Sequence, residues 1–137
     1  MTGVVVLGAT GSVGTHAADV IEAHADRFRA VALASRRRGP ALLARARRLG
    51  SRVIALVDEA AAEELRPALR PGDPEVRAGE AGLLSLLAED GVDTVLQATT
   101  GAAGLPASLE AVRRGLRLAL ANKESLVVAG PLLVAAA

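Results

Sequence analysis

The chain has 137 residues, no cysteine and a formal net charge of +1. This is the length of one ordinary domain, and so small a charge excludes a global field that would attract nucleic acid or an acidic membrane surface. Without cysteine there is no disulfide framework, thiolate nucleophile or sulfur ligand for a metal. Because no apolar run is as long as a membrane span, we expect a cytoplasmic protein without a membrane partner.

The order of apolar segments predicts the fold class. Phe28 is the only aromatic residue, so the core consists of aliphatic side chains, as is typical of helices that cover a parallel sheet. Apolar runs of strand length alternate with segments of helical period, the pattern of successive βαβ units. We therefore predict an α/β, Rossmann-like three-layer domain with a mostly parallel sheet. Strands are expected at residues 4–7, 30–34, 53–57, 92–98 and 116–121, and helices at 13–25, 41–49, 59–70 and 83–88.

The first strand is followed by a turn with three evenly spaced glycines, Gly8, Gly11 and Gly14. A phosphate can bind at a helix N-terminus when the preceding loop brings bare backbone N–H groups close to it. The hydroxyls of Thr10 and Ser12 add possible donors to phosphate oxygens. The turn therefore predicts dinucleotide binding, although the same glycines are also compatible with a purely structural turn.

Three consecutive arginines, Arg36, Arg37 and Arg38, follow the second predicted strand. In dinucleotide-binding domains an acidic residue here binds the ribose 2′-hydroxyl, whereas arginine accommodates a 2′-phosphate. The loop has no acidic residue, so it favours NADP over NAD. A solvated basic turn is the plainer interpretation. Nucleic-acid binding by these arginines together with Arg45, Arg47 and Arg48 is disfavoured, because no aromatic residues accompany them to stack on bases.

Two segments near the carboxyl end carry further candidate residues. Small residues, Gly101 among them, follow the fourth predicted strand, where a cofactor could lie against the backbone, although a plain glycine-containing loop is the alternative. The last predicted strand leads into Asn122, Lys123 and Glu124, and the chain has no other asparagine or lysine. Asn122 and Lys123, beside the Glu124 carboxylate, suit a polar reaction site. The alternative is that Asn122 caps a helix and that Lys123 and Glu124 form a surface ion pair.

No internal boundary divides the chain, so residues 1–137 are predicted to form one NADP-binding domain. Its last residues, 132–137, are all apolar and lack a helix cap or polar tail, so we expect the sequence to be truncated at its carboxyl end. His16 and His24 lie eight residues apart without an acid at ligand spacing. We therefore predict no metal ligand in this chain.

The glycine turn (8–14), the segment Thr-Gly-Ala-Ala-Gly-Leu (100–105) and the segment Ala-Asn-Lys-Glu-Ser-Leu-Val (121–127) together resemble the amino-terminal domain of 1-deoxy-D-xylulose 5-phosphate reductoisomerase. The resemblance implies an NADPH-dependent enzyme of non-mevalonate isoprenoid biosynthesis. Such an enzyme rearranges 1-deoxy-D-xylulose 5-phosphate, a phosphosugar, and reduces it to 2-C-methyl-D-erythritol 4-phosphate. The resemblance also implies Mg2+ or Mn2+ and a homodimer for the full-length enzyme.

Matching positions imply the roles of individual residues. Those expected at the cofactor phosphates are Thr10, Gly11, Ser12 and Val13. Asn122 and Glu124 would lie at the nicotinamide, and Lys123 would contact the substrate. The family has its metal-binding acids and substrate-phosphate residues further along the sequence, so this chain alone is expected to be inactive.

One departure and two alternatives remain. Where the family commonly has glycine and asparagine around the 2′-phosphate, this chain has Arg36 and Arg38. Another reductase with the same glycine turn, such as a semialdehyde dehydrogenase, is an alternative, although that family uses a cysteine nucleophile. A stand-alone NADP-binding or sensing module without catalysis is the other.

Overall fold

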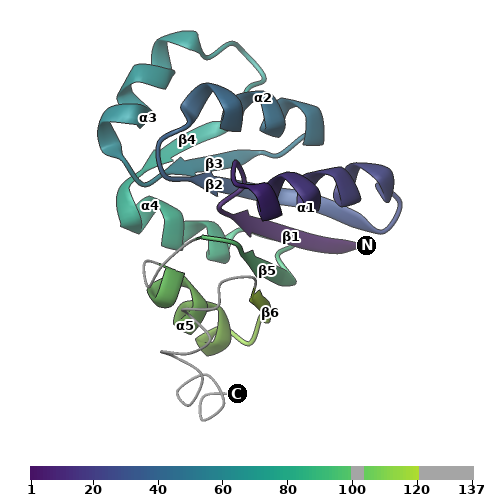
Figure 1. The fold of residues 1–137 in the computed structure, drawn as a ribbon. Helices are drawn as coiled ribbons and strands as arrows, with labels where there is room; N and C mark the ends of the chain where they lie inside the picture. The colour runs from purple at the N-terminus through teal and green to yellow at the C-terminus, as the bar shows by residue number, and fades with distance from the viewer. Residues whose placement is uncertain (100–103, 121–137) are drawn as a thin grey trace.

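In the computed structural model, residues 1–99 and 104–120 are described, and they form a six-stranded sheet flanked by helices on both faces (Figure 1). The sheet order is β4-β3-β2-β1-β5-β6, and every neighbouring pair is parallel. The strands are β1 (Thr2–Leu7), β2 (Phe28–Ser35), β3 (Val53–Leu56), β4 (Glu75–Ala78), β5 (Thr94–Gln97) and β6 (Arg117–Leu120). The helices are α1 (Ser12–Ala23), α2 (Gly39–Leu49), α3 (Glu59–Leu65), α4 (Gly79–Ser85) and α5 (Leu105–Arg113), with 3-10 turns η1 (Arg66–Ala68) and η2 (Leu86–Ala88).

The alternation of side chains along the strands divides the core into two layers. Val4 and Val6 of β1 pack with α1, α2 and α3, whereas Val5 and Leu7 pack on the opposite face, with η2 and α5. All four valine and leucine side chains are buried. Because both faces of the sheet are covered, its central strands are apolar throughout, which is how a buried parallel sheet differs from a half-exposed one. The predicted α/β three-layer fold is confirmed.

A bulge in β2 interrupts this alternation. The pairing of β1 with β2 shifts between Val4 and Val5, so that Ala30 and Ala32 oppose consecutive residues and Val31 is extra. Ala30 and Leu33 consequently face the α1–α3 layer, and Ala32 faces the other. The extra residue changes which face of the sheet the following side chains of β2 point to, up to the loop at the end of the strand.

The predicted elements agree with the structure most closely in the first half of the chain. The five predicted strands correspond to β1, β2, β3, β5 and β6, with ends that differ by one or two residues. The short edge strand β4 was not predicted. The predicted helix over 59–70 was too long, since α3 ends at Leu65 and a 3-10 turn containing Pro67 follows. The helix predicted at 83–88 begins earlier, at Gly79, and ends as a 3-10 turn.

The strand order creates a topological switch point. Successive crossovers from β1 lead outwards to β4, and the chain then returns to place β5 on the other side of β1. The connections after β1 and β5 therefore leave the sheet toward opposite faces. In open α/β sheets the crevice at such a point, outside the carboxyl ends of the strands, is where ligands bind.

Candidate functional site

A cavity of about 910 Å3 lies at this switch point. Its walls come from the loops after β1, β2, β3 and β5 and from the starts of α4 and α5. The lining residues are Gly8, Thr10, Gly11, Ser12, Ala34, Ser35, Arg36, Arg37, Arg38, Val57, Glu80, Leu83, Ala98, Thr99 and Pro106. The cavity therefore brings together the glycine turn, the arginine loop and the beginning of the loop after β5, which are separated by tens of residues in the sequence.

Gly8 and Gly14 fix the position of α1 against the sheet. Gly8 has a φ of +84°, and a Cβ there would lie 2.8 Å from the carbonyl carbon and oxygen of Ala98 at the end of β5. A Cβ on Gly14 would lie 2.2 Å from the carbonyl oxygen of Gly8. Both positions therefore require glycine, one for backbone conformation and close strand contact, the other for close approach of the helix.

Gly11 differs from these two glycines. It has an extended conformation, with φ −79° and ψ 178°, and a Cβ there would meet only the Gly8 carbonyl oxygen, at 3.6 Å. The fold itself therefore tolerates a side chain at this position. Because Gly11 has no side chain, the cavity stays open in front of the α1 N-terminus. A cofactor phosphate would have to approach the helix through this opening.

The N-terminus of α1 itself is uncapped. Gly11 supplies no side chain to bond the first N–H groups, and the first turn contains no acidic residue. The N–H groups of Ser12 and Val13 have no intrahelical acceptor at this position. Uncapped N–H groups and the positive end of the helix dipole favour an anion. Ser12 and Val13 are both exposed, and both belong to the predicted phosphate-binding residues.

Hydrogen bonds hold the rest of the turn in place. The N–H groups of Gly8 and Ala9 both donate to the carbonyl oxygen of Ala34 in β2, at 3.0 and 2.8 Å. The Thr10 and Ser35 hydroxyls lie 2.8 Å apart and form a hydrogen bond in which either can be the donor. Ser35 is buried, so the Thr10 side chain is anchored at the end of β2. The turn after β1 is thus fastened directly to the strand that carries the arginines.

The three arginines lie together at the cavity rim, and all are exposed. The Arg37 Nε is 3.8 Å from an Asp58 carboxylate oxygen, an ion pair between exposed side chains. Asp58 also caps α3, its other carboxylate oxygen accepting from the Ala61 N–H at 3.1 Å. Within residues 1–99 and 104–120, the side chains of Arg36 and Arg38 form no hydrogen bond or ion pair. These two guanidinium groups are therefore available to an anionic ligand.

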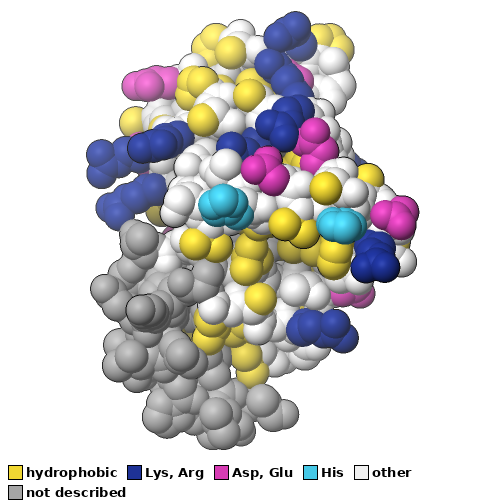
Figure 2. All heavy atoms as spheres, turned by 45° about the vertical axis from the view of Figure 1, so that its right-hand side comes forward, with side chains coloured by type: hydrophobic (Ala, Val, Ile, Leu, Met, Phe, Trp, Pro, Cys, Tyr) yellow, Lys and Arg dark blue, Asp and Glu magenta, His cyan; other side chains and the backbone are white. Residues whose placement is uncertain are grey.

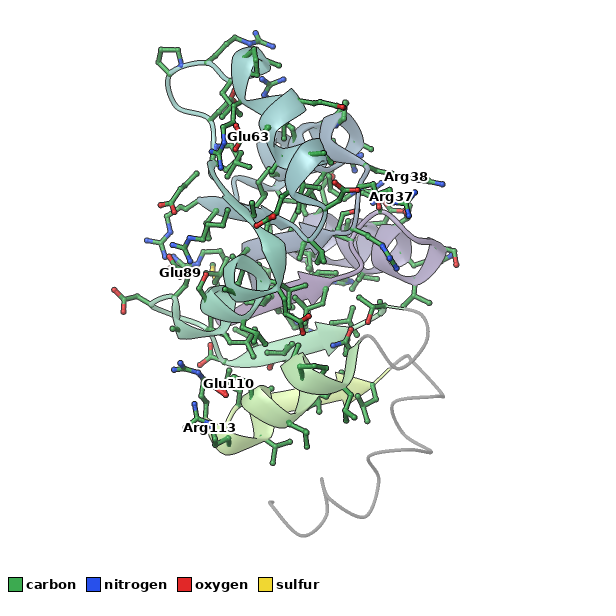
Figure 3. All side chains as sticks on the ribbon, turned by 90° about the vertical axis from the view of Figure 1, so that its left-hand side faces the viewer. Arg37, Arg38, Glu63, Glu89, Glu110 and Arg113 are labelled. Carbon is green, nitrogen blue, oxygen red and sulfur yellow. The ribbon has the colours of Figure 1, made fainter. Side chains whose placement is uncertain are left out.

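The pictures agree with this arrangement. Figure 3 shows the labelled Arg37 and Arg38 extending from the loop between β2 and α2, beside the turn that follows β1. On the face shown in Figure 2, basic and acidic side chains are interspersed over the helices, while a group of basic side chains gathers at the left-hand edge. The charge of this face is therefore mixed rather than uniformly basic.

Gln97, to which the sequence analysis assigned no role, organises the far wall of the cavity. Its side chain is fully buried at the end of β5. The amide nitrogen donates to the Gly104 carbonyl at 3.0 Å, and the amide oxygen accepts from the N–H of Thr99 at 3.2 Å and from its hydroxyl. Gly104 must be glycine, because a Cβ there would lie 2.5 Å from the Thr99 hydroxyl oxygen. Gln97 thus ties the two ends of the loop after β5 to each other.

Four predicted site residues, Gly101, Asn122, Lys123 and Glu124, lie outside the described residues. In the part of the chain that is described, no three His, Cys, Asp or Glu side chains are grouped so that they could hold a metal ion. No helix there is long and apolar enough to cross a membrane. Asp93 has a structural role: its carboxylate accepts from the Gly3 N–H at 2.8 Å, which fastens the start of β5 to β1.

A second, smaller cavity of about 330 Å3 lies at the amino ends of β3 and β4, around the carboxyl end of α2 and the loop before β4. The arginines that line it already have hydrogen-bond partners within the protein. Arg47 forms two hydrogen bonds with the Asp73 carboxylate, at 2.9 and 2.8 Å, and Arg52 donates to the Asp90 carbonyl. The switch-point cavity, with its uncapped helix and unpaired arginines, is therefore the better candidate site.

Comparison with known proteins identifies the family. The model of the 1-deoxy-D-xylulose 5-phosphate reductoisomerase family matches residues 4–130. Proteins of that name from Anaeromyxobacter sp. strain K and Rhodospirillum centenum are 44% and 46% identical, over 100% and 96% of this chain but 35% and 33% of their own length. The chain thus spans about a third of the length of the curated relatives it matches.

Solved structures show the same likeness. The Zymomonas mobilis reductoisomerase in complex with NADPH is 39% identical, with a TM-score of 0.91 over 98% of this chain and 35% of that one. A DOX-P reductoisomerase in complex with NADPH, fosmidomycin and magnesium is 36% identical, also with a TM-score of 0.91, over 99% of this chain and 34% of that one. The chain therefore belongs to the 1-deoxy-D-xylulose 5-phosphate reductoisomerase family.

Proposed function

We propose that this chain is the NADPH-binding part of an oxidoreductase that rearranges and reduces 1-deoxy-D-xylulose 5-phosphate to 2-C-methyl-D-erythritol 4-phosphate. The observation that carries the proposal is the uncapped N-terminus of α1, which faces a cavity at the switch point next to two unpaired arginines. Family membership excludes the semialdehyde dehydrogenase alternative. Relatives whose structures contain NADPH support the choice of cofactor.

The glycine turn and the arginine loop bind different parts of the cofactor. Thr10, Gly11, Ser12 and Val13 bind the pyrophosphate through backbone N–H groups and hydroxyls at the helix start. The guanidinium groups of Arg36 and Arg38 bind the 2′-phosphate, with Arg37 beside them. Bound in this way, NADPH supplies the hydride for the reduction.

Other parts of the proposal concern residues and partners beyond the described structure. Gly101, Asn122 and Glu124 contact the cofactor near its nicotinamide, and Lys123 contacts the phosphosugar substrate. Mg2+ or Mn2+ is held by ligands outside this chain; three of the similar solved structures contain magnesium. A homodimer and a location in the cytoplasm also remain predictions.

The arginine loop gives the sharpest test of cofactor choice. Replacing both Arg36 and Arg38 by alanine should weaken NADPH binding about 10- to 100-fold, the effect of losing charge-assisted hydrogen bonds. NADH lacks the 2′-phosphate, so its affinity should stay within about twofold. Titration of NADPH fluorescence, with NADH in parallel, measures both affinities.

Arg70→Ala is the matched control, because Arg70 is an exposed arginine in the loop before β4, away from the cavity. It should leave both affinities unchanged. If the double variant weakened NADPH and NADH equally, the assignment of the 2′-phosphate would be wrong. If the unaltered chain bound neither cofactor, the proposed function would fail.

A measurement of enzyme activity distinguishes the proposed function from the remaining alternative, a binding module without catalysis. Since the chain spans about a third of the length of its relatives, we expect it to bind NADPH without turning over 1-deoxy-D-xylulose 5-phosphate in the presence of Mg2+. Joined to the remaining two thirds of the Anaeromyxobacter relative, it should oxidise NADPH in a substrate-dependent way. A folded fusion that binds NADPH but shows no turnover would favour the binding module.

A further inference from the structure

Arg45 lies in the middle of α2, outside the three-arginine loop, and its side chain reaches the turn after β1. The guanidinium Nη1 donates to the carbonyl oxygen of Ala9 and to the Thr15 hydroxyl oxygen, the latter at 3.1 Å. The Thr15 hydroxyl in turn donates to the Gly11 carbonyl at 2.8 Å. One side chain from α2 therefore fastens two carbonyl groups of the glycine turn, one directly and one through Thr15.

The orientation of these carbonyls decides what the turn offers to a ligand. A peptide unit whose C=O points toward a neighbouring helix directs its N–H away from that helix. The Gly11 carbonyl also accepts from the Thr15 N–H, and the Gly8 carbonyl from the Gly11 N–H. The carbonyls of Gly8, Ala9 and Gly11 are thus all engaged within the protein. The N–H groups at the start of α1 are the ones left for an anion.

The guanidinium also adds a fixed positive charge behind the turn. Arg45 is partly buried, and nowhere among the described residues does it form an ion pair with a carboxylate. Its charge is therefore not neutralised locally, and in partly buried surroundings such a charge is screened less than at the surface. Like the dipole of α1, this charge makes the electrostatic potential at the helix N-terminus more positive.

We propose that Arg45 is a positioning residue for the dinucleotide pyrophosphate: it holds the glycine turn with its N–H groups toward the cavity and adds to the positive potential there. This inference rests on the proposed function and deepens it. It assigns the pyrophosphate subsite a residue from α2, whereas the 2′-phosphate is bound by the loop between β2 and α2. The two subsites therefore respond differently to substitution.

Arg45→Met removes the donors and the charge but keeps an apolar side chain of similar length. It should weaken NADPH and NADH by the same factor, about tenfold, because both contain the pyrophosphate. Binding of 2′-AMP, which has no pyrophosphate, should be unchanged. Arg45→Lys keeps a charge and a donor but not the planar group, so it should lose part of the affinity, again equally for both dinucleotides.

Arg48→Ala is the matched control. Arg48 also connects α2 to α1, through hydrogen bonds to Glu22, but it does so one turn further along α2. Its substitution removes a bridge between the same two helices without touching the glycine turn. Affinities for all three ligands should stay at the level of the unaltered chain.

The titrations are made well below the melting temperature of each variant. If Arg45→Met does not fold, Arg45→Lys alone decides the outcome. Unchanged dinucleotide affinity in the variants that fold would overturn the role of Arg45 while leaving NADPH binding by the unaltered chain intact. An equal loss of 2′-AMP binding would also overturn it, because the effect would then be a general distortion of the cavity. Failure of the unaltered chain to bind NADPH would instead count against the proposed function.

Discussion

Gly11 and Gly14 lie three residues apart and lack side chains for different reasons. Within the protein a Cβ on Gly11 would make only an ordinary contact, whereas one on Gly14 would overlap the Gly8 carbonyl oxygen. Gly14→Ala should therefore destabilise the fold by about 2 kcal/mol or more. Gly11→Ala should change the free energy of unfolding by less than about 0.5 kcal/mol but weaken NADPH binding at least about tenfold, since the methyl group would occupy the path of the phosphate.

Urea unfolding and NADPH titration of the two variants separate these effects, each variant serving as the control for the other. A Gly11→Ala variant that kept full NADPH affinity would remove Gly11 from the phosphate site. A Gly14→Ala variant as stable as the unaltered chain would mean that α1 can shift away from the turn without cost.

Gln97 allows a second prediction about a single residue. Because its amide is fully buried and bonded to Thr99 and Gly104, Gln97→Leu should lower the free energy of unfolding by about 1–3 kcal/mol, the cost of leaving buried partners unsatisfied. Ser108→Ala is the comparison, since the Ser108 hydroxyl donates to the same Gly104 carbonyl. If Gln97→Leu proved no more destabilising than Ser108→Ala in urea unfolding, Gln97 would not be what holds the loop.

Site residues could be predicted where the sequence pattern that identifies them is contiguous, and could not be predicted where their role depends on contacts between distant segments. The glycine turn and Arg36–Arg38 could be predicted because each is a contiguous motif next to a strand. Arg45 could not: it lies 36 residues from Ala9, and the sequence around it has the pattern of an ordinary basic helix surface. Only the packing of α2 beside α1 brings its guanidinium to the turn.

At the scale of elements, the largest omission from the sequence analysis is β4. Its four residues include one buried apolar side chain, Val76, next to the charged Glu75 and Arg77. Such a segment has the local pattern of a loop, and it becomes a strand by pairing with β3 at the sheet edge. The overlong third helix has a local cause instead: Pro67 has no N–H with which to continue the hydrogen bonds of the α-helix. Arg66 before it still has helical dihedral angles, and the chain continues as a 3-10 turn.

The loop that leads into β4 is held by an ion pair that should respond to pH. Hydrogen bonds from Arg47 and from the Arg70 N–H hold the pKa of Asp73 well below its ordinary value. Since the folded-state pKa is the lower one, Asp73 contributes stability above about pH 4 and loses that contribution as the pH falls below this value. Asp73→Asn should therefore lower the melting temperature at pH 7, with a difference that shrinks under acidic conditions.

Melting curves from pH 7 to pH 2 test this dependence, because the contribution is lost gradually between the unfolded-state pKa and the lower folded-state pKa. Asp26→Asn is the control, because Asp26 is exposed and its carboxylate has no hydrogen-bond partner within the described part of the chain. It should follow the unaltered chain at every pH. A difference between Asp73→Asn and the unaltered chain that was as large at pH 2 as at pH 7 would contradict the role of the Asp73 carboxylate.

At the scale of the whole molecule, the fold was predictable because one physical rule applies throughout. Parallel strands buried on both faces have apolar runs, and the helices between them have one apolar side, so the βαβ alternation is visible in the sequence. The position of β5 beside β1 was harder to predict from the sequence. It depends on which strand the chain pairs with after β4, and both sheet faces offer similar aliphatic side chains.

Cofactor binding should also be measurable in the stability of the whole domain. A ligand at a hundred times its dissociation constant stabilises the native state by about 2.7 kcal/mol. NADPH at that concentration should therefore raise the melting temperature clearly, and NADH at the same concentration should raise it less, because its dissociation constant is larger. Equal increases with the two cofactors would contradict a preference for the 2′-phosphate.

The return of the chain from β4 to β5 has a dynamic consequence. Within the sheet, β5 and β6 join the other strands only through the four paired positions between β1 and β5, and the cavity lies across this seam, with Ala98 and Thr99 on one side and the arginine loop on the other. A dinucleotide that touches both sides acts as a clamp. Amide hydrogen exchange in β5 and β6 should then slow when NADPH binds, although most of the proposed contacts lie beyond β1 and β2.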